Sequence, residues 1–233
     1  MNDSLKHSAA AAALDELKTG MVIGLGSGST MAYFIRGLGE RVRRGLSVST
    51  VATSLQSASL AAEEGIPVRT FREHKALDLT VDGADEVSPR LDLVKGLGGA
   101  LVREKIVAKA SRRLIIVVDE TKLVDRLGSR VPVPVEVLPF ARDLVEYTLA
   151  GIGGEPRVRL VDGVVFESDN GNHILDWHVE PIEDPGGLEK DLKSITGVVD
   201  SGIFANLADR VIVAGAGGIR TMDRPGQKGE TAE

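Results

Sequence analysis

The chain of 233 residues contains no cysteine, few aromatic residues and no long apolar run. Without cysteine it can form no disulfide, no thiolate nucleophile and no cysteine-ligated metal site. Aromatic residues make up only 3% of the sequence, so the core must consist mainly of Val, Leu, Ile and Ala. No stretch approaches 18 apolar residues, so we expect no transmembrane helix. Asp15 and Glu16 interrupt the apolar start of the chain, so we expect no signal peptide and a cytoplasmic protein.

The charge balance is mildly acidic, with a net charge of −6 at pH 7. This argues against nucleic acid as the main partner, because proteins that bind nucleic acid usually carry a basic surface. The rest of the composition, 42% hydrophobic and 27% charged, is typical of a globular protein. A chain of this length can form one large or two small domains, each with a core.

Strand-like and helix-like segments alternate in the first part of the chain, which predicts an α/β fold with a parallel sheet and crossover helices. Ligands bind beyond the carboxyl ends of the strands in such sheets, so the loops after these strands are the places to look for a site. The expected helices cover 3–18, 31–38, 54–64 and 100–110, and the expected strands cover 21–25, 47–53, 66–70, 77–82, 91–94 and 114–118.

A change of pattern near residue 130 predicts a second domain. The alternating prolines of 131–137 are typical of an edge strand or a linker. The later strand and helix patterns lack the earlier rhythm, which favours a small α+β domain, and the apolar runs at 211–214 and 219–222 return to the first sheet. The polar tail from Asp223 is expected to fray. The expected domains are thus a Rossmann-like main domain, 1–130 plus 206–233, and an α+β domain, 131–205, inserted before the final strands.

The segment from Asp82 to Glu104 is the richest in chemistry. It opens with Asp-Gly-Ala-Asp-Glu at 82–86, and after eight intervening residues Lys95 precedes the glycine cluster 96–99. Carboxylates can accept and donate protons, and a lysine can stabilise an oxyanion. Glycines let backbone N–H groups approach a ligand closely. Such parts suit a metal-free site that moves protons on a small anionic substrate.

Other interpretations fit the same residues. The acidic segment could be an ordinary turn, because Asp and Gly favour turns. Clustered carboxylates could instead bind magnesium. A phosphatase aspartate pair fits less well, because two residues rather than one separate Asp82 from Asp85. Glu104 could be a surface residue favoured by the helix dipole, and Lys6 and Lys122 could be ordinary surface lysines.

A second motif, Gly-Leu-Gly-Ser-Gly-Ser-Thr at 24–30, lies between an expected strand and an expected helix. The free N–H groups of such a loop, its hydroxyls and the helix start would favour phosphate. The motif matches neither a Walker loop nor the dinucleotide fingerprint. An ordinary turn with Ser29 as the helix N-cap would also explain it. Ser54, after another strand, fits a helix cap better than a ligand contact, and the four histidines show no metal-binding spacing.

Together these motifs resemble the ribose-5-phosphate isomerase family of type A. The resemblance covers nearly the whole chain and is carried, in order, by the loop 24–30, DGADE at 82–86, KGLGGALVREK at 95–105, PVEV at 134–137, DNGN at 169–172 and GIFAN at 202–206. It implies reversible interconversion of ribose 5-phosphate and ribulose 5-phosphate in the pentose phosphate pathway. It also implies that the protein needs no metal or organic cofactor and forms a homodimer or homotetramer.

The resemblance further implies roles for individual residues. Glu104 would move a proton between C2 and C1 of the sugar, and Asp82 would help to open the ring. Asp85 would hold sugar hydroxyls or share that task. Lys95 and N–H groups of the glycine loop would stabilise the developing negative charge. The expected substrate-binding residues are Ser27, Gly28, Ser29, Thr30, Gly96, Gly98, Gly99, Lys122 and Lys6.

Two residues depart from the family pattern, and two other functions stay open. Ser27 replaces a threonine, and Leu97 replaces a usual glycine, so its side chain could crowd the loop or point outward. An amino-sugar-phosphate deaminase needs a similar base and phosphate loop, but no histidine here is obviously placed to assist ring opening. A non-catalytic sugar-phosphate sensor of a transcription regulator would need a DNA-binding segment, and the chain has no spare one.

Overall fold

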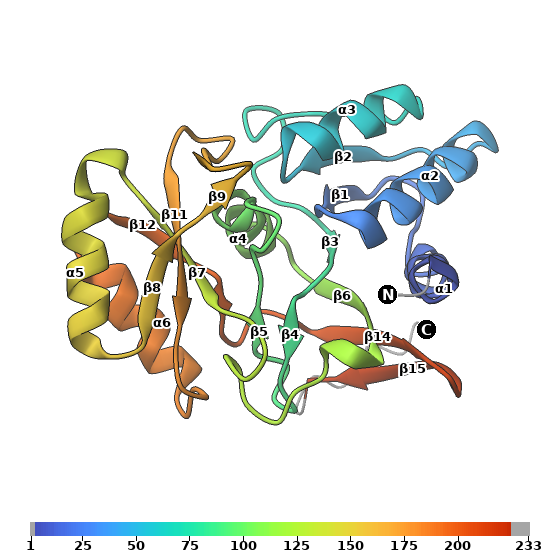
Figure 1. Cartoon of the computed structure of the whole chain (residues 1–233). Coiled ribbons are helices and arrows are strands. Elements are labelled where there is room, and N and C mark those ends of the chain that lie inside the picture. The colour runs from blue at the N-terminus through green and yellow to red at the C-terminus, as the bar shows by residue number, and fades with distance from the viewer. Residues whose placement is uncertain (1–2, 225–233) are drawn as a thin grey trace.

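A six-stranded sheet dominates one half of the molecule in the computed structural model, which describes residues 3–224 (Figure 1). The strand order is β15-β14-β6-β3-β1-β2, and every neighbouring pair is parallel except β14 with β15. The strands are β1 (Val22–Leu25), β2 (Ser49–Ala52), β3 (Leu79–Asp82), β6 (Leu114–Asp119), β14 (Arg210–Gly215) and β15 (Gly218–Asp223). The predicted α/β fold, with its last strands returning to this sheet, is confirmed.

The sheet separates two apolar cores, as β6 shows. Ile115 and Val117 belong to the core formed with α1 (Asp3–Leu14) and α2 (Ser29–Arg43). Ile116, between them, belongs to the core on the opposite face. Because successive side chains of a strand point to opposite faces, a strand covered on both faces must be apolar throughout. The uninterrupted apolar run of β6 follows from this constraint.

The second core lies against a small three-stranded sheet with the order β13-β5-β4. The strands are β4 (Glu86–Val87), β5 (Leu93–Val94) and β13 (Ile203–Phe204), and every pairing is antiparallel. β5 ends directly before Lys95 and the glycine cluster. Helix α4 (Leu101–Lys109) follows and lies between the two halves of the molecule (Figure 1).

The other half is a four-stranded antiparallel sheet with the order β12-β7-β11-β8. Its elements are β7 (Val133–Val137), β8 (Glu155–Val158), β11 (His173–His178), β12 (Val198–Ser201), α5 (Arg142–Ile152) and α6 (Pro185–Ser194), with a hairpin of β9 (Leu160–Val161) and β10 (Val164–Val165). These elements have their own apolar core, although residues of the first part, such as Val94 and Leu127, contribute to it. The domain limits at 130 and 206 therefore stay a prediction.

Two strand predictions are wrong. β7 is not an edge strand, because it lies between β12 and β11. The Pro134 carbonyl accepts a hydrogen bond from the N–H of Gly202, at 2.6 Å, and Gly202 lies just beyond the end of β12. The nitrogen and the carbonyl of one strand residue face the same side, so the Pro134 nitrogen also lies beyond the end of β12. Proline is tolerated there because β12 needs no donor at that position. The segment 66–70 forms only an isolated bridge, between Thr50 and Val68, since Pro67 cannot donate to a ladder.

Other element limits differ from the predictions by a few residues. α1 ends at Leu14 rather than residue 18, and α2 continues to Arg43 rather than ending at residue 38. Asp223 still belongs to β15, and the rest of the tail expected to fray, 225–233, lies outside the described residues. Among residues 3–224, no helix combines the length and apolar character that a membrane span requires. The remaining elements are α3 (Leu55–Glu63) and the 3₁₀ turns η1 (Glu120–Lys122) and η2 (Pro139–Ala141).

A buried lysine joins the two halves. Lys105 on α4 is 2% exposed, and its Nζ lies 2.6 Å from both Glu189 Oε1 on α6 and Asp200 Oδ1 on β12. The same ammonium lies 4.9 Å from the ring centroid of Phe204. Burial alone would raise the pKa of Asp200, but the charge and hydrogen bond of Lys105 outweigh it and lower that pKa. The network therefore ties α4 to the antiparallel half through opposite charges.

Replacing Lys105 by Ala should lower the free energy of unfolding by about 1.5–3 kcal/mol, because it removes the charged hydrogen bonds that two partly buried carboxylates, Glu189 and Asp200, accept from this ammonium. The matched variant Lys109→Ala, at an exposed site on the same helix, should change it by less than about 0.5 kcal/mol. Urea unfolding of both variants measures the difference. Since the pKa of Asp200 is lowered by folding, its contribution is lost as the pH falls through that pKa. Equal stability of the two variants would contradict this account.

Candidate active site

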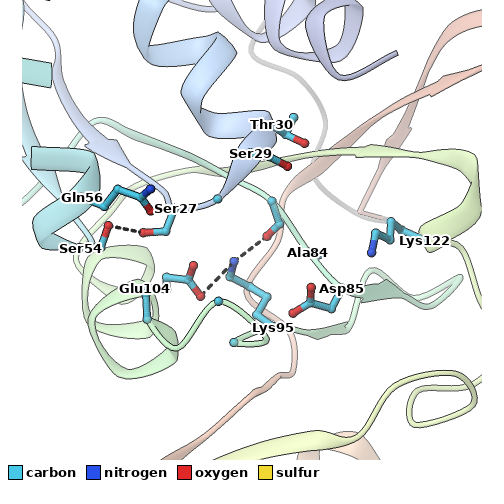
Figure 2. Close-up of a pocket in the computed structure, with 15 residues that line it drawn as sticks. Ser27, Ser29, Thr30, Ser54, Gln56, Ala84, Asp85, Lys95, Glu104 and Lys122 are labelled. Atoms are coloured by element: carbon cyan, nitrogen blue, oxygen red, sulfur yellow. Dashed lines mark hydrogen bonds and ion pairs between the residues drawn. The ribbon is translucent and has the colours of Figure 1, made fainter. Parts of the chain in front are cut away.

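A cavity of about 210 Å³ lies beyond the carboxyl ends of β1, β2, β3 and β6 (Figure 2). Its walls come from the loop between β1 and α2, the start of α3, the turn after β3, the loop between β5 and α4, and η1. Parallel strands bring these loops to one edge of the sheet, although they lie far apart in the sequence. Most of the predicted site residues line this cavity: Ser27, Gly28, Ser29, Thr30, Asp85, Lys95, Gly96, Gly98, Glu104 and Lys122.

Three predicted residues lie outside the wall. Asp82 is 1% exposed and contacts Lys95 from beneath the cavity. Gly99 shapes the turn, because its φ is +84° and a Cβ there would lie 2.4 Å from the ring of Phe166. Lys6 lies on α1, where its Nζ is 3.4 Å from Asp3 Oδ1, and the structure does not bring it to the cavity.

The sequence analysis missed part of the wall, and it assigned Ser54 mainly as a cap. Gln56, Gly83, Ala84 and Ala100 line the cavity and were not predicted as site residues. The available signal for Gln56 was a polar residue in the first turn of a helix that follows a parallel strand. Ser54 is indeed the N-cap of α3, accepting from Ser57 N, and it also lines the cavity.

Lys95 is the centre of the buried charges. Its side chain is 3% exposed, and its Nζ lies 3.0 Å from Asp82 Oδ2 and 3.3 Å from Glu104 Oε2. Nζ also donates a hydrogen bond to the Gly83 carbonyl, at 2.6 Å. Figure 2 shows this lysine and Glu104 directed toward each other from different segments of the wall. The ammonium of Lys95 therefore lies between the carboxylates of Asp82 and Glu104 and offsets their negative charges.

Burial and mutual repulsion shift the protonation of these groups. Burial, followed by the charge of Asp82, raises the pKa of Glu104 to about 8, against the opposing pull of Lys95. Burial also raises the pKa of Asp82, although Lys95 and backbone hydrogen bonds oppose the shift. Burial alone would lower the pKa of Lys95, but the charges of Asp82, Glu104 and Asp85 outweigh it, so that pKa is raised. Lys95 therefore stays charged, while Glu104 can exchange a proton near neutral pH.

The two carboxylates differ in their hydrogen bonds. Asp82 Oδ1 accepts from the N–H of Ser27, at 3.2 Å, and of Gly83, at 2.7 Å. Glu104 Oε2 is buried and faces the Lys95 ammonium at 3.3 Å, but among the described residues no backbone N–H donates to it. Donors favour the ionised form of an acid, so Asp82 is the better stabilised anion. Gly26 is needed beside it, because a Cβ there would lie 2.1 Å from Asp82 Oδ1.

The acidic motif 82–86 divides its side chains between site and scaffold. Asp85 lines the cavity and accepts from the N–H of Leu97, at 3.0 Å. Glu86 is 1% exposed and accepts from three N–H groups of the loop 128–131. An ordinary acidic turn does not account for this arrangement, because Asp82 and Asp85 both reach Lys95 or its loop.

The end of the cavity at the start of α2, away from Glu104, carries groups that favour an anion. Gly28, with φ +97°, is the N-cap of α2 and makes no side-chain capping bond, so Ser29 is not the cap. The uncapped N–H groups at this helix start, near the hydroxyls of Ser29 and Thr30, favour negative charge. Lys122 lines the same cavity, and Figure 2 shows it far from Glu104. Together these groups favour a bound anion at this end of the cavity.

Two further positions explain the loop geometry. The Ser27 hydroxyl lies 2.8 Å from the hydroxyls of both Thr53 and Ser54, so it ties the loop between β1 and α2 to the end of β2. Leu97 is 39% exposed and does not line the cavity, so its side chain points outward and does not crowd the site. None of the four histidines lines the cavity either.

Comparison with known proteins agrees with this geometry. The family model described as ribose 5-phosphate isomerase A (phosphoriboisomerase A) matches residues 49–218. The chain is 50% identical to ribose-5-phosphate isomerase A of Gloeobacter violaceus over 221 residues, which cover 94% of this chain and 96% of that protein. This chain belongs to the ribose 5-phosphate isomerase A family.

Solved structures of the family match this chain closely. Ribose 5-phosphate isomerase A of Methanocaldococcus jannaschii has a TM-score of 0.92 and 43% identity, covering 96% of this chain and all of that one (100%). A D-ribose-5-phosphate isomerase in complex with phospho-erythronic acid has a TM-score of 0.93 and 42% identity, covering 96% of this chain and 100% of that one. The enzyme of Plasmodium falciparum, at 38% identity, has a TM-score of 0.92 and covers 96% of this chain and 99% of that one.

Replacing Lys122 by Met should raise the Kd for inorganic phosphate at least about threefold, because it removes a positive charge from the end of the cavity formed by Lys122 and the start of α2. The effect should shrink at high salt, which screens exposed charges. Isothermal titration calorimetry measures it. Lys18→Met, at an exposed position away from the cavity, is the control. If both variants bind phosphate like the unmodified chain, Lys122 is not part of the anion site.

Proposed function

We propose that this chain interconverts D-ribose 5-phosphate and D-ribulose 5-phosphate with Glu104 as the general base, as a step of the pentose phosphate pathway. One observation carries the proposal: a buried carboxylate with a pKa of about 8 shares a cavity with a buried lysine and an uncapped helix start. A general base works best when its pKa lies near the operating pH. Family membership and the related complex with phospho-erythronic acid give the substrate class.

The proposed reaction moves one proton between two carbons. Glu104 removes the proton from C2 of the open-chain aldose, and negative charge develops on the oxygen at C1. This gives a cis-enediolate. Glu104 then returns the proton to C1, while the proton of the C2 hydroxyl passes to the oxygen at C1, so that C2 becomes the carbonyl of the ketose and C1 carries a hydroxyl. One carboxylate on one face of the intermediate can carry out both transfers.

The neighbouring charges support this assignment. Lys95, fixed by Asp82 and Gly83, lies 3.3 Å from Glu104 and can stabilise the developing negative charge. Asp82 assists ring opening as an acid–base group and holds Lys95 in place. Asp85 contacts sugar hydroxyls or shares in ring opening from the wall of the cavity.

The phosphate group would bind at the other end of the cavity. Ser29, Thr30 and Lys122 supply hydroxyls and a cation there, and Gly28 leaves the helix start open. The expected contacts of the sugar with the loops come from Ser27, Gly96, Gly98 and, through the shape of the turn, Gly99. Lys6 has no comparable support, because it lies on α1 away from the wall.

We also propose that the enzyme works without a metal or organic cofactor, in the cytoplasm, as a homodimer or homotetramer. Lys95 already provides the charge that a metal ion would bring to Asp82 and Glu104. An exposed apolar surface, which includes Phe140, Leu144 and Tyr147, is available for contact between copies. Analytical ultracentrifugation tests the oligomeric state.

Glu104→Gln should lower turnover of ribose 5-phosphate by about 10²–10⁴, the usual contribution of a positioned general base. The amide keeps the shape of the side chain but cannot accept the C2 proton. Ketopentose formation in EDTA measures the effect and the metal independence together.

The matched control is Glu180→Gln, at an exposed glutamate outside the cavity, which should keep full turnover. A Glu104→Gln variant within a few-fold of the unmodified enzyme would remove Glu104 from the role of base. Activity abolished by EDTA and restored by magnesium would contradict the metal-free mechanism. An unmodified chain that binds the sugar phosphate without turnover would contradict the isomerase activity itself.

A further inference from the structure

Arg159, from the antiparallel half, holds the glycine turn of the active site. Its Nη1 donates hydrogen bonds to the carbonyls of Gly96 and Leu97, each at 2.9 Å. Nε and Nη2 of the same side chain donate to the two oxygens of Asp176 on β11. The ring of Phe166 lies 5.8 Å from the guanidinium carbon. The side chain is 9% exposed, so its position is fixed on several sides.

The segment that Arg159 contacts is a turn with two possible orientations of its central peptide. The N–H of Gly99 donates to the Gly96 carbonyl at 2.9 Å, so Leu97 and Gly98 are the central residues. Gly98 has no positive φ here. A type II turn would rotate the Leu97–Gly98 peptide by about 180° and needs φ above zero at Gly98, which glycine adopts at little cost. The local sequence therefore does not by itself select one orientation.

The orientation of this peptide decides where one N–H group points. No peptide bond in residues 3–224 is cis, so each carbonyl points away from the N–H that follows it. The Leu97 carbonyl points to Arg159, and the Gly98 N–H therefore points to the opposite side. The preceding peptide behaves in the same way. Arg159 binds the Gly96 carbonyl, and the N–H of Leu97, on the other side of that peptide, donates to Asp85 Oδ2 in the cavity wall. Gly98 lines the cavity, and its N–H has no acceptor within the described part of the chain.

We propose that Arg159 is a positioning residue that holds the Leu97–Gly98 peptide with the Gly98 N–H directed at the substrate oxygen that becomes negative. This inference rests on the proposed isomerase function and adds a donor to Lys95. Donors stabilise a transition state best when they point at the developing charge before the reaction starts. Two hydrogen bonds from one fixed guanidinium supply that preorganisation, and a flipped peptide would present a carbonyl in place of the N–H.

The first test is steady-state kinetics of Arg159→Met. The kcat should fall at least about tenfold, part of the 10²–10³-fold contribution of a single oxyanion donor, while KM changes by less than threefold. Arg157→Met, at an exposed position two residues earlier that pairs with exposed Glu155, should leave both constants unchanged. Arg159→Lys keeps a charge for Asp176 but cannot hold two carbonyls as well, so its kcat should also fall.

The second test separates positioning from a general loss of structure by measuring two affinities in Arg159→Met. Phospho-erythronic acid carries a carboxylate where the enediolate oxygens would lie, so its Kd should rise at least about tenfold. Inorganic phosphate, which would occupy only the end with Ser29, Thr30 and Lys122, should keep its Kd within twofold.

The outcomes distinguish this inference from the proposed function. Unchanged kcat in both Arg159 variants, or an equal loss of affinity for the two probes, would overturn the role of Arg159 and leave the isomerase intact. An unmodified chain without isomerase activity would instead overturn the proposed function. A selective loss of kcat and of phospho-erythronic acid affinity, with phosphate binding retained, is the result that we expect.

Discussion

The ammonium of Lys95, buried between Asp82 and Glu104, is the interaction on which the site depends. Three charged side chains that are each 1–5% exposed can stay together only if their charges offset one another and hydrogen bonds satisfy the rest. Asp82 obtains these bonds from Ser27 and Gly83, whereas Glu104 does not. In the proposed mechanism this asymmetry suits the two acids to different tasks: Asp82 fixes the lysine and assists ring opening, and Glu104 exchanges the C2 proton.

The antiparallel half of the molecule completes the site without supplying any of the groups that line it. Arg159 holds the glycine turn, and Asp169 accepts from the N–H of Leu55 at the start of α3. Arg103, next to Glu104, donates to the carbonyl of Asp169. Lys105, on its other side, binds Glu189 and Asp200. The proposed general base thus lies on a helix that is anchored to the second half from both neighbouring positions.

The sequence predicted structure best where a local residue pattern is compatible with one kind of environment. The strand β6 and the strand–loop–helix at 22–43 could be predicted. Burial on both faces requires an uninterrupted apolar run, and an open loop before a helix is visible as glycines and hydroxyl residues. Pro134 was misinterpreted, since its place inside the sheet depends on where β12 ends. Glu86 is indistinguishable from Asp82 by composition, although it binds the loop 128–131 instead. Arg159 carried no local signal, because the carbonyls that it holds, those of Gly96 and Leu97, lie more than 60 residues away in the sequence.

The central claim, that burial among charges brings Glu104 into the range of a neutral-pH base, can be tested by titrating this carboxyl directly. Carbon-13 NMR of the glutamate-labelled enzyme, with Glu104→Gln to assign the signal, gives its midpoint. Because the pKa is raised to about 8, the carboxyl should be mostly protonated below that pH and ionised above it, with a midpoint shared in part with Asp82. A midpoint near the ordinary value for glutamate, about 4.3, would contradict the account.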